Sequence, residues 1–391
     1  MVNILTPSFT NIVLRKKEFS ILYTQSHNTN LLKSIVFVLI IFPFISHIYG
    51  AVFPALYNFE IFNIVFAIIA FVMIIAVYEN RIVWDKDIVY FLPFFLTALA
   101  SSVYNNDLYF LKYFAYIFIY FFFLKRFFLQ KFIFKLYVNI LVFTFFILIV
   151  IYFLTLNFDF HKFFVVRDLN FLSLNSPMHL KDHQSQVFYL LIYQNDYSGI
   201  FNIPRFYGFS REPGMYVMFI IPGFLMACFF KMKFQAFTLA FAILITSSFT
   251  GYVVLFLLLY ISVLPIKSYS SMIYLILIPI SLLVIFRNDT ISLLDSERAN
   301  VYLSMFENSF INLSFIGALF ILSFIVILYN YFIKLKTINL KIVVLFFISI
   351  VILLNKASEL LSPLFLFYLS FIDFIYKVRK HLETNRDNIR I

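Results

Sequence analysis

Residues 136–156 read LYVNILVFTFFILIVIYFLTL, an almost entirely apolar stretch without a charged side chain. A helix needs about 20 such residues to cross the hydrocarbon core of a bilayer, so this stretch is long enough to span a membrane. Comparable runs lie at 32–49, 60–78, 88–104, 108–124, 214–230, 271–286, 312–333, 342–354 and 360–376. Residues 234–248 and 250–264 read as two shorter helices in a hairpin. The sequence therefore predicts an all-α polytopic integral membrane protein with about 12 transmembrane helices.

The composition supports the same class of protein. Hydrophobic residues make up 63% of the 391 residues and charged residues 13%, whereas a soluble domain carries roughly 25% charged residues. The single cysteine, Cys228, lies inside an apolar run, so an intramolecular disulfide is excluded. The polar N-terminal segment lacks the apolar core of a cleaved signal peptide, and we expect the first hydrophobic run to remain as an anchor.

The positions of lysine and arginine predict the orientation. With the N-terminus inside, segments facing the cytoplasm carry 21 of the 30 basic residues, as expected for cytoplasmic loops. The excess positive charge of the chain, formally +11, thereby comes from the cytoplasmic segments, which face anionic lipid, and a nucleic-acid partner is not expected. The predicted organisation is a cytoplasmic segment at 1–31, helices 1–5 within 32–156, an extracytoplasmic loop at 157–212, helices 6–12 within 213–376 with a second extracytoplasmic loop at 287–311, and a cytoplasmic tail at 377–391, so that both termini are cytoplasmic.

The first outer loop is too long to be an ordinary connector, and long loops in compact proteins are usually functional or disordered. Ser176-Pro177 is a plausible helix start, and apolar residues follow it at helical spacing. These residues are Met178, Leu180, Val187, Leu190 and Leu191. We expect an amphipathic helix lying on the outer membrane surface.

The loop ends in R-F-Y-G-F-S-R-E-P-G, from Arg205 to Gly214. Pro213 suits the first turn of the next helix, which places Glu212 at the cap, near the positive end of the helix dipole. Gly208 and Gly214 permit close backbone approach. Arg205 and Arg211 with this carboxylate suit a ligand that carries a phosphate and a hydroxyl group. The alternative is a structural Arg–Glu pair with helix capping.

Two further residues, Arg298 and His183, are candidates for the same chemistry. In the second outer loop, Arg298 would complete an arginine clamp, unless it is simply a solvated charge. His179 and His183 share a helical spacing found in zinc sites, but no third ligand is evident, so we predict no metal site. His183 remains a candidate base or hydroxyl-binding residue. The chain contains no P-loop, G-x-G-x-x-G or G-x-S-x-G motif.

These features resemble the O-antigen polymerase and ligase family of bacterial envelope glycan synthesis. The matching elements are the twelve-span plan, the long outer loop and its ending R-x-x-G-x-x-x-E-P-G at 205–214. A second match is T-S-S-F-T-G at 246–251, where family members often have Thr-x-Ser-Arg-x-Gly. Phe249 stands in the arginine position of that pattern, which favours a polymerase over a ligase.

The resemblance implies glycosyl transfer at the outer leaflet of the bacterial plasma (inner) membrane. The donor would be a glycan on undecaprenyl pyrophosphate, and the acceptor a hydroxyl of another lipid-linked repeat unit of O-antigen or capsule. Arg205, Arg211 and Arg298 would bind the pyrophosphate, and Glu212 or His183 would deprotonate the acceptor. No cofactor or metal is expected; the expected partners are the lipid-linked glycan, membrane lipid, a chain-length regulator and a flippase.

Three alternatives stay open. An O-antigen ligase shares the motifs. A flippase or secondary transporter also has twelve spans, but transporters keep ionisable residues near the midplane and often show repeated halves. A polyprenyl-phosphate-sugar glycosyltransferase usually carries acidic residues in its first outer loop, and the loop at 50–59 has none.

Overall fold

The structure is a computed structural model, and it describes residues 33–35, 37–38, 87, 89–92, 96, 120–158, 165–167, 185–188, 191–193, 204–209, 213–248, 251–252, 255–256, 326–327, 329–331, 333 and 363–389. The elements in chain order are η3 (Tyr120–Leu124, a π-helix), α6 (Lys125–Phe128), α7 (Lys131–Asn157), β1 (Val165–Arg167), β2 (Ser185–Phe188), β3 (Leu191–Tyr193), α8 (Pro213–Phe229), α9 (Lys233–Ile245) and α16 (Pro363–Ile389). The described part of the chain is therefore mostly helical, with one small sheet.

Two compact units can be distinguished. The first comprises residues 1–81, 126–263 and 346–371, and the second comprises 82–125, 264–345 and 372–391. Helices α7, α8 and α9 and the three strands belong to the first unit, while α16 begins in the first unit and continues into the second.

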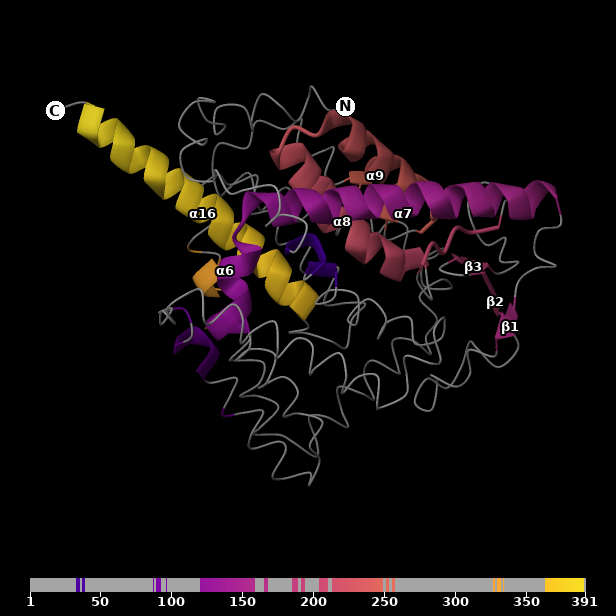
Figure 1. Ribbon diagram of the computed structural model, residues 1–391, viewed down its shortest axis with the longest axis horizontal. Helices are drawn as coiled ribbons and strands as arrows, with labels where there is room; N and C mark the ends of the chain where they lie inside the picture. Colours follow the sequence, from indigo (N-terminus) through magenta and orange to yellow (C-terminus); the bar gives the residue numbers. More distant parts are fainter. Residues whose placement is uncertain are drawn as a thin grey trace, which may run out of the picture. The chain divides into compact units, whose positions relative to one another are not determined.

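Helix α7 contains the whole predicted span 136–156. Of the described helices it is the one long and apolar enough to cross a membrane, and α8 and α9 each contribute a shorter apolar helix. The three helices pack against one another (Figure 1). Along α7 one side is buried and includes Tyr137, Leu141, Leu148 and Tyr152. Because each backbone amide of a helix bonds within its own segment, an apolar stretch of this length is most stable as a helix in hydrocarbon.

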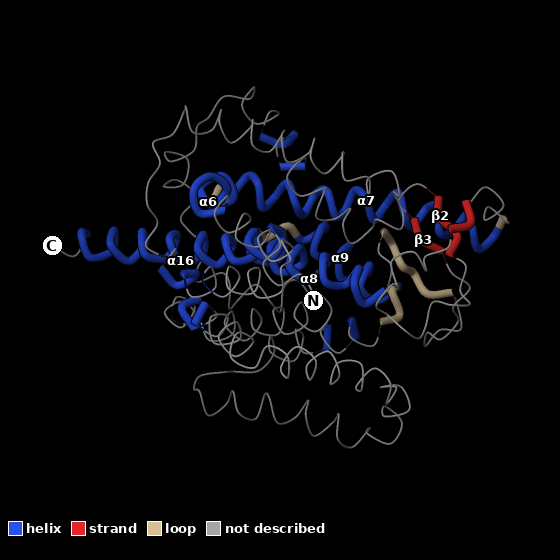
Figure 2. Tube along the Cα trace, turned by 90° about the horizontal axis from the view of Figure 1, so that it is seen from below, coloured by secondary structure: helices blue, strands red, loops and turns tan. Residues whose placement is uncertain are grey.

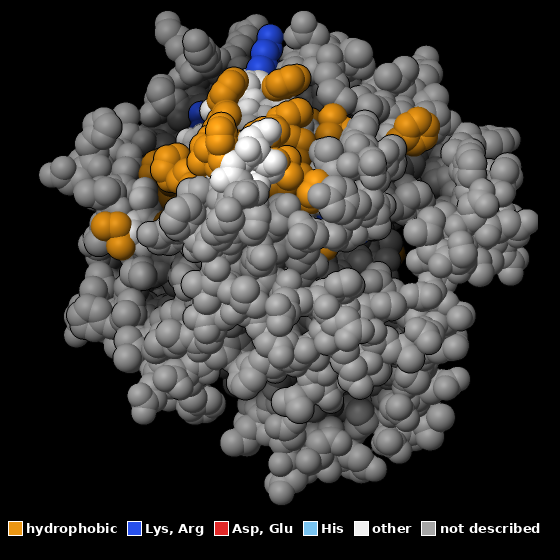
Figure 3. Space-filling view, turned by 90° about the vertical axis from the view of Figure 1, so that its right-hand side faces the viewer, with side chains coloured by type: hydrophobic (Ala, Val, Ile, Leu, Met, Phe, Trp, Pro, Cys, Tyr) orange, Lys and Arg blue, Asp and Glu red, His pale blue; other side chains and the backbone are white. Residues whose placement is uncertain are grey.

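The exposed side of the first unit is apolar as well. Phe143, Phe146 and Val150 on α7 and Phe234 and Phe237 on α9 are exposed, and the rings of Phe146 and Phe234 stack with their centroids 6.0 Å apart. On the face shown in Figure 3, the described side chains are mostly hydrophobic. Such a surface is unfavourable in water and suits contact with lipid, where charged side chains would be costly.

Helices α8 and α9 form an antiparallel pair joined by three residues. The end of α8 is closed by a Schellman motif, in which Met232 N–H donates to the Ala227 carbonyl (2.9 Å) and Lys231 N–H donates to the Cys228 carbonyl (3.1 Å). Lys231 adopts a left-handed φ of 58°, at the position that glycine usually fills. Its positive charge lies at the helix C-terminus, where the dipole favours a cation.

Close approach of α7 and α8 depends on a glycine. A Cβ atom at Gly223 would lie 2.5 Å from Leu141 Cδ1 of α7. One position earlier, Pro222 interrupts the hydrogen bonding of α8. Beside it the buried Tyr137 hydroxyl donates to the Phe219 carbonyl (3.0 Å) and lies 2.7 Å from the Tyr368 hydroxyl of α16. This buried network holds the interrupted helix against its neighbours.

The first unit has an aromatic core around Phe367 of α16. Its ring centroid lies 5.3 Å from that of Phe37, 5.2 Å from those of Phe128 and Phe134, and 5.1 Å from that of Tyr137. The pair with Phe134 is stacked, that with Phe37 is tilted and the other two are edge-to-face, and aromatic pairs add roughly 0.5–1.5 kcal/mol each beyond area burial. The abundance of phenylalanine therefore has a packing role here.

The predicted outer loop, 157–212, departs from its expected secondary structure. Strands β1, β2 and β3 form an antiparallel sheet in that order, and the pairs include Val165 with Val187 and Val187 with Ile192. Figure 2 shows the sheet near the C-terminal end of α7, which β3 contacts. The predicted amphipathic helix is therefore wrong for Ser185–Phe188 and Leu191–Tyr193. In the sequence, the apolar residues of this segment stand among β-branched and aromatic residues, which favour a pleated sheet. Cross-strand pairing therefore outweighs the helical spacing of the apolar residues.

Several predictions concern residues only partly described. Spans 32–49, 88–104, 108–124 and 312–333 are helical wherever they are described, the third of them through η3. Helix α16 starts within span 360–376 and continues to Ile389, so the predicted tail extends this helix. Five predicted segments lie outside the described residues: the spans 60–78, 271–286 and 342–354, the N-terminal segment 1–31 and the loop at 287–311. The count of about 12 spans stays a prediction.

Candidate functional site

The segment 204–209, immediately before the motif's Arg211 and Glu212, is held on α7 and α8. The Tyr152 hydroxyl of α7 donates to the Pro204 carbonyl. Two residues later, Phe206 is fully buried, and its ring makes edge-to-face contacts with Phe145, Tyr152 and Tyr216, at centroid distances of 5.9, 5.3 and 5.5 Å. The segment is thus anchored at both positions by buried aromatic side chains.

Gly208 is required by the geometry of this segment. Its φ is +59°, and a Cβ atom would lie 2.6 Å from the Tyr216 ring. The next residue, Phe209, packs edge-to-face on Tyr216 at 4.8 Å and contacts Phe219 at 5.6 Å. The predicted close backbone approach at Gly208 is confirmed, because both the left-handed backbone and the ring beneath it exclude larger residues.

Arg205 lies between the two anchored positions. Its neighbours in the chain are Pro204, whose carbonyl accepts the bond from Tyr152, and the buried Phe206. Arg205 itself is half-buried, and its Nε atom is enclosed by protein. Because the backbone at Arg205 is held in place, its guanidinium group can occupy only a small region. An arginine held in this way is suited to bidentate binding of phosphate oxygens.

Helix α8 begins at Pro213, as predicted, and Gly214 follows in its first turn. The start of a helix carries partial positive charge and unsatisfied backbone amides, which favour a bound anion. Glu212 directly precedes this start in the sequence. The other predicted site residues, Arg211, Glu212, His183 and Arg298, lie outside the described residues, so their relation to Arg205 stays a prediction.

The second motif segment forms a tight turn after α9. Thr246 Oγ1 donates to the Ile243 carbonyl (2.7 Å) and accepts from Ser248 N–H (3.3 Å). Ser248 Oγ accepts from Gly251 N–H (3.4 Å), three residues on, which is the pattern of an N-cap. Beyond the turn the Tyr252 hydroxyl donates to the Leu244 carbonyl (3.0 Å), which holds residues 251–252 against the end of α9; the hairpin of 234–248 and 250–264 stays a prediction.

The two motif segments meet on consecutive residues of α8. Gly208 lies against the ring of Tyr216, and a Cβ atom at Gly251 would lie 3.1 Å from Val217 Cγ2. The structure therefore brings the R-x-x-G segment and the T-S-S turn to the first turns of the same helix. The sequence did not predict the contact of this turn with α8. The local signal for the turn is Ser248, a residue type favoured at the N-cap of a helix.

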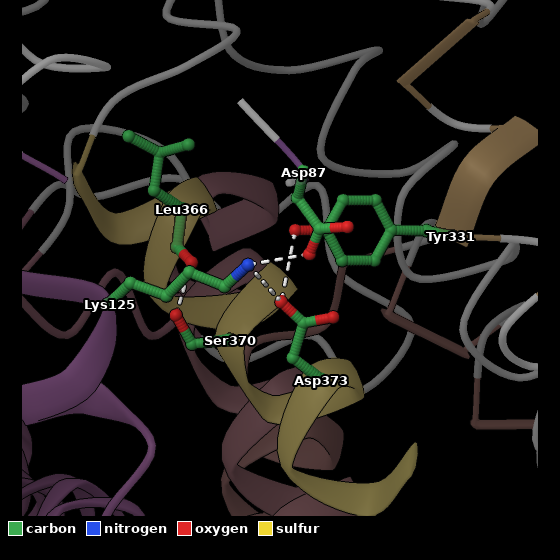
Figure 4. A network of polar contacts seen from close by, with 6 residues as sticks. All are labelled: Asp87, Lys125, Tyr331, Leu366, Ser370 and Asp373. Atoms are coloured by element: carbon green, nitrogen blue, oxygen red, sulfur yellow. Dashed lines mark hydrogen bonds and ion pairs between the residues drawn. The ribbon is translucent and has the colours of Figure 1, made fainter. Parts of the chain in front are cut away.

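A second polar cluster lies in the second unit (Figure 4). Lys125 Nζ is 2.6 Å from Asp87 Oδ2 and 3.1 Å from Asp373 Oδ2. The Tyr331 hydroxyl donates to the same Asp373 oxygen at 3.4 Å, and the ammonium lies 5.2 Å from the centroid of the Phe121 ring. Lys125 and Asp373 are each 2% exposed. We call Asp87, Lys125, Tyr331 and Asp373 the ionic cluster.

Sequence reasoning did not find the ionic cluster because its members belong to no motif. They lie near the predicted cytoplasmic ends of four different predicted spans. The predicted orientation would therefore place all four at a similar depth in the membrane, which is consistent with their contacts. The π-helix η3 ends at Leu124, directly before Lys125. Turns of this kind are rare and occur frequently at functional sites.

Comparison with known proteins adds no assignment: no family model, curated protein or solved structure matches this chain.

Proposed function

We propose that this chain is a glycosyltransferase that polymerises undecaprenyl-pyrophosphate-linked oligosaccharide repeat units at the outer leaflet of the bacterial plasma membrane. The product would be an O-antigen or capsular polysaccharide. The observation that carries the proposal is the Arg205–Gly208 segment, anchored beside the start of α8, where an anion-favouring helix terminus and an arginine occur together. The sequence places Arg211 and Glu212 within the same short connection.

The proposed reaction is a single displacement. The acceptor hydroxyl oxygen attacks the anomeric carbon of the donor glycan, and its proton passes to the Glu212 carboxylate, or alternatively to His183. The bond between the anomeric carbon and the pyrophosphate oxygen breaks, and undecaprenyl pyrophosphate leaves with its electron pair. Arg205, Arg211 and Arg298 would stabilise the charge on the leaving group. Attack from the opposite side inverts the configuration at the anomeric carbon.

Replacement of the proposed base tests this function. Glu212→Gln keeps the shape of the side chain but cannot accept a proton, so glycan elongation in cells should be lost while the protein level stays normal. Arg211→Ala should have the same effect through the leaving group. Asp196→Asn, which alters an acidic residue of the same outer loop outside the motif, serves as the matched control and should leave long glycan chains. Normal chain lengths in the Glu212→Gln variant would count against the site.

A secondary transporter is the second candidate, because the ionic cluster contains buried charged side chains, although they lie near the predicted cytoplasmic ends of their spans and not at the midplane. Buried ionisable residues within membrane proteins often mark ion or proton pathways. For a transporter, Asp373→Asn would abolish translocation of the lipid-linked glycan, and Glu212→Gln would be harmless. For a polymerase, translocated single repeat units would accumulate in the Glu212→Gln variant.

A further inference from the structure

The contacts of Tyr152 extend beyond ordinary packing of α7. Its hydroxyl donates to the carbonyl of Pro204, and its ring contacts Phe206 at 5.3 Å, so one side chain holds both residues that flank Arg205. Tyr152 is 2% exposed and sits near the C-terminal end of α7. A hydrogen bond and a ring contact from one rigid helix leave the intervening residue little freedom to move.

We infer that Tyr152 is a positioning residue that holds Arg205 in place to bind the pyrophosphate group of the substrate. This inference rests on the proposed function for the identity of the ligand, but the mechanical link from Tyr152 to Arg205 is independent of it. Tyr152 does not act on the reacting atoms. It fixes the backbone from which the guanidinium extends, and preorganised donors bind charge more effectively than mobile ones.

The chain provides a matched control on the same helix. Tyr137 is also 2% exposed and also donates to a backbone carbonyl, that of Phe219 at 3.0 Å. It belongs to the network with Tyr368 and lies in the N-terminal half of α7, whereas Tyr152 lies in the C-terminal half. Tyr137→Phe and Tyr152→Phe therefore each remove a bond to a backbone carbonyl and keep the ring, and Tyr137→Phe also removes the bond between the Tyr137 and Tyr368 hydroxyls. A purely structural role for the hydroxyl group would affect both variants alike.

The experiment measures the reactivity of Arg205 in the full-length protein in detergent. Phenylglyoxal modifies arginine, and peptide mass spectrometry reports the rate at Arg205. We expect Tyr152→Phe to raise this rate about three- to tenfold, the range that corresponds to loss of one hydrogen bond, and Tyr137→Phe to leave it unchanged. Equal rates in the wild type and Tyr152→Phe, or equal increases in both variants, would overturn the inference.

A second measurement separates this inference from the proposed function. Inorganic pyrophosphate should protect Arg205 in the wild type, and half-protection in Tyr152→Phe should need about three- to tenfold more pyrophosphate. If pyrophosphate gives no protection even in the wild type, the proposed ligand is wrong, while the comparison of modification rates still decides the role of Tyr152. Protection with an unchanged half-point in Tyr152→Phe contradicts the positioning role alone.

Discussion

Replacing Lys125 by methionine should strongly destabilise the protein. The change removes the ammonium group that lies 2.6 Å from Asp87 Oδ2 and 3.1 Å from Asp373 Oδ2, and keeps a side chain of similar length. Removing one partner of a buried ion pair costs about 3–5 kcal/mol, because the remaining charge stays in a medium of low dielectric constant. The Asp373 side chain is 3% exposed and should incur this cost in full, whereas that of Asp87 is 18% exposed and retains some solvation. We therefore expect a loss of about 3 kcal/mol.

Reversible unfolding in mixed detergent micelles would measure this loss as a change in the free energy of unfolding. Lys135→Met, which removes a half-buried lysine of α7, should change it by less than about 0.5 kcal/mol. The double variant of Lys125→Met with Asp373→Asn should be less destabilised than the sum of the single losses, with a coupling of roughly 0.5–3 kcal/mol. Additive losses, or a Lys125→Met variant as stable as the wild type, would refute the reasoning.

Three other outcomes are expected. Gly208→Ala should reduce glycan elongation and lower the free energy of unfolding by at least about 1 kcal/mol, because the backbone at Gly208 is left-handed and the added Cβ atom would meet Tyr216. Adding Tyr216→Leu should recover part of this stability. No difference between the single and double variants would argue against the contact. Gly223→Val should cost about 1–3 kcal/mol by separating α7 from α8, measured by unfolding in micelles, and Leu141→Ala should relieve part of that loss. EDTA should leave the elongation rate in detergent unchanged, since arginines rather than a metal are proposed to hold the pyrophosphate; a loss that added Mg²⁺ restores would contradict this.

The limits of helices were predictable wherever the deciding signal was local. Residues 136–156 required a helix because of their length and apolar character, and α7 contains all of them. Pro213 marked the start of α8, since a residue without an N–H group suits a first turn. The strands between α7 and α8 were not predictable in this way, because their apolar residues fit helical spacing and only cross-strand partners such as Val165 and Val187 select the sheet.

The candidate site was predictable in part. The sequence indicated Arg205 and the close approach at Gly208, since arginine and glycine in one motif suggest phosphate binding at a tight backbone. It contained no sign that Tyr152, 52 positions before Pro204, would donate to that carbonyl. Nor did it connect Lys125 with Asp373, because pairing between segments far apart in the sequence leaves no pattern along the chain.

The helical form of the long apolar segment in α7 was thus determined by the sequence alone. Hydrocarbon offers no partner to a backbone amide, so every long apolar segment must satisfy its hydrogen bonds internally, whatever lies beside it. Tertiary structure alone decided which side chains meet: the ring of Tyr216 under Gly208, the hydroxyl of Tyr152 on Pro204, and Lys125 between two carboxylates. Those contacts depend on how helices pack, and helix packing in lipid is governed by the shapes and polar groups of the facing surfaces rather than by hydropathy.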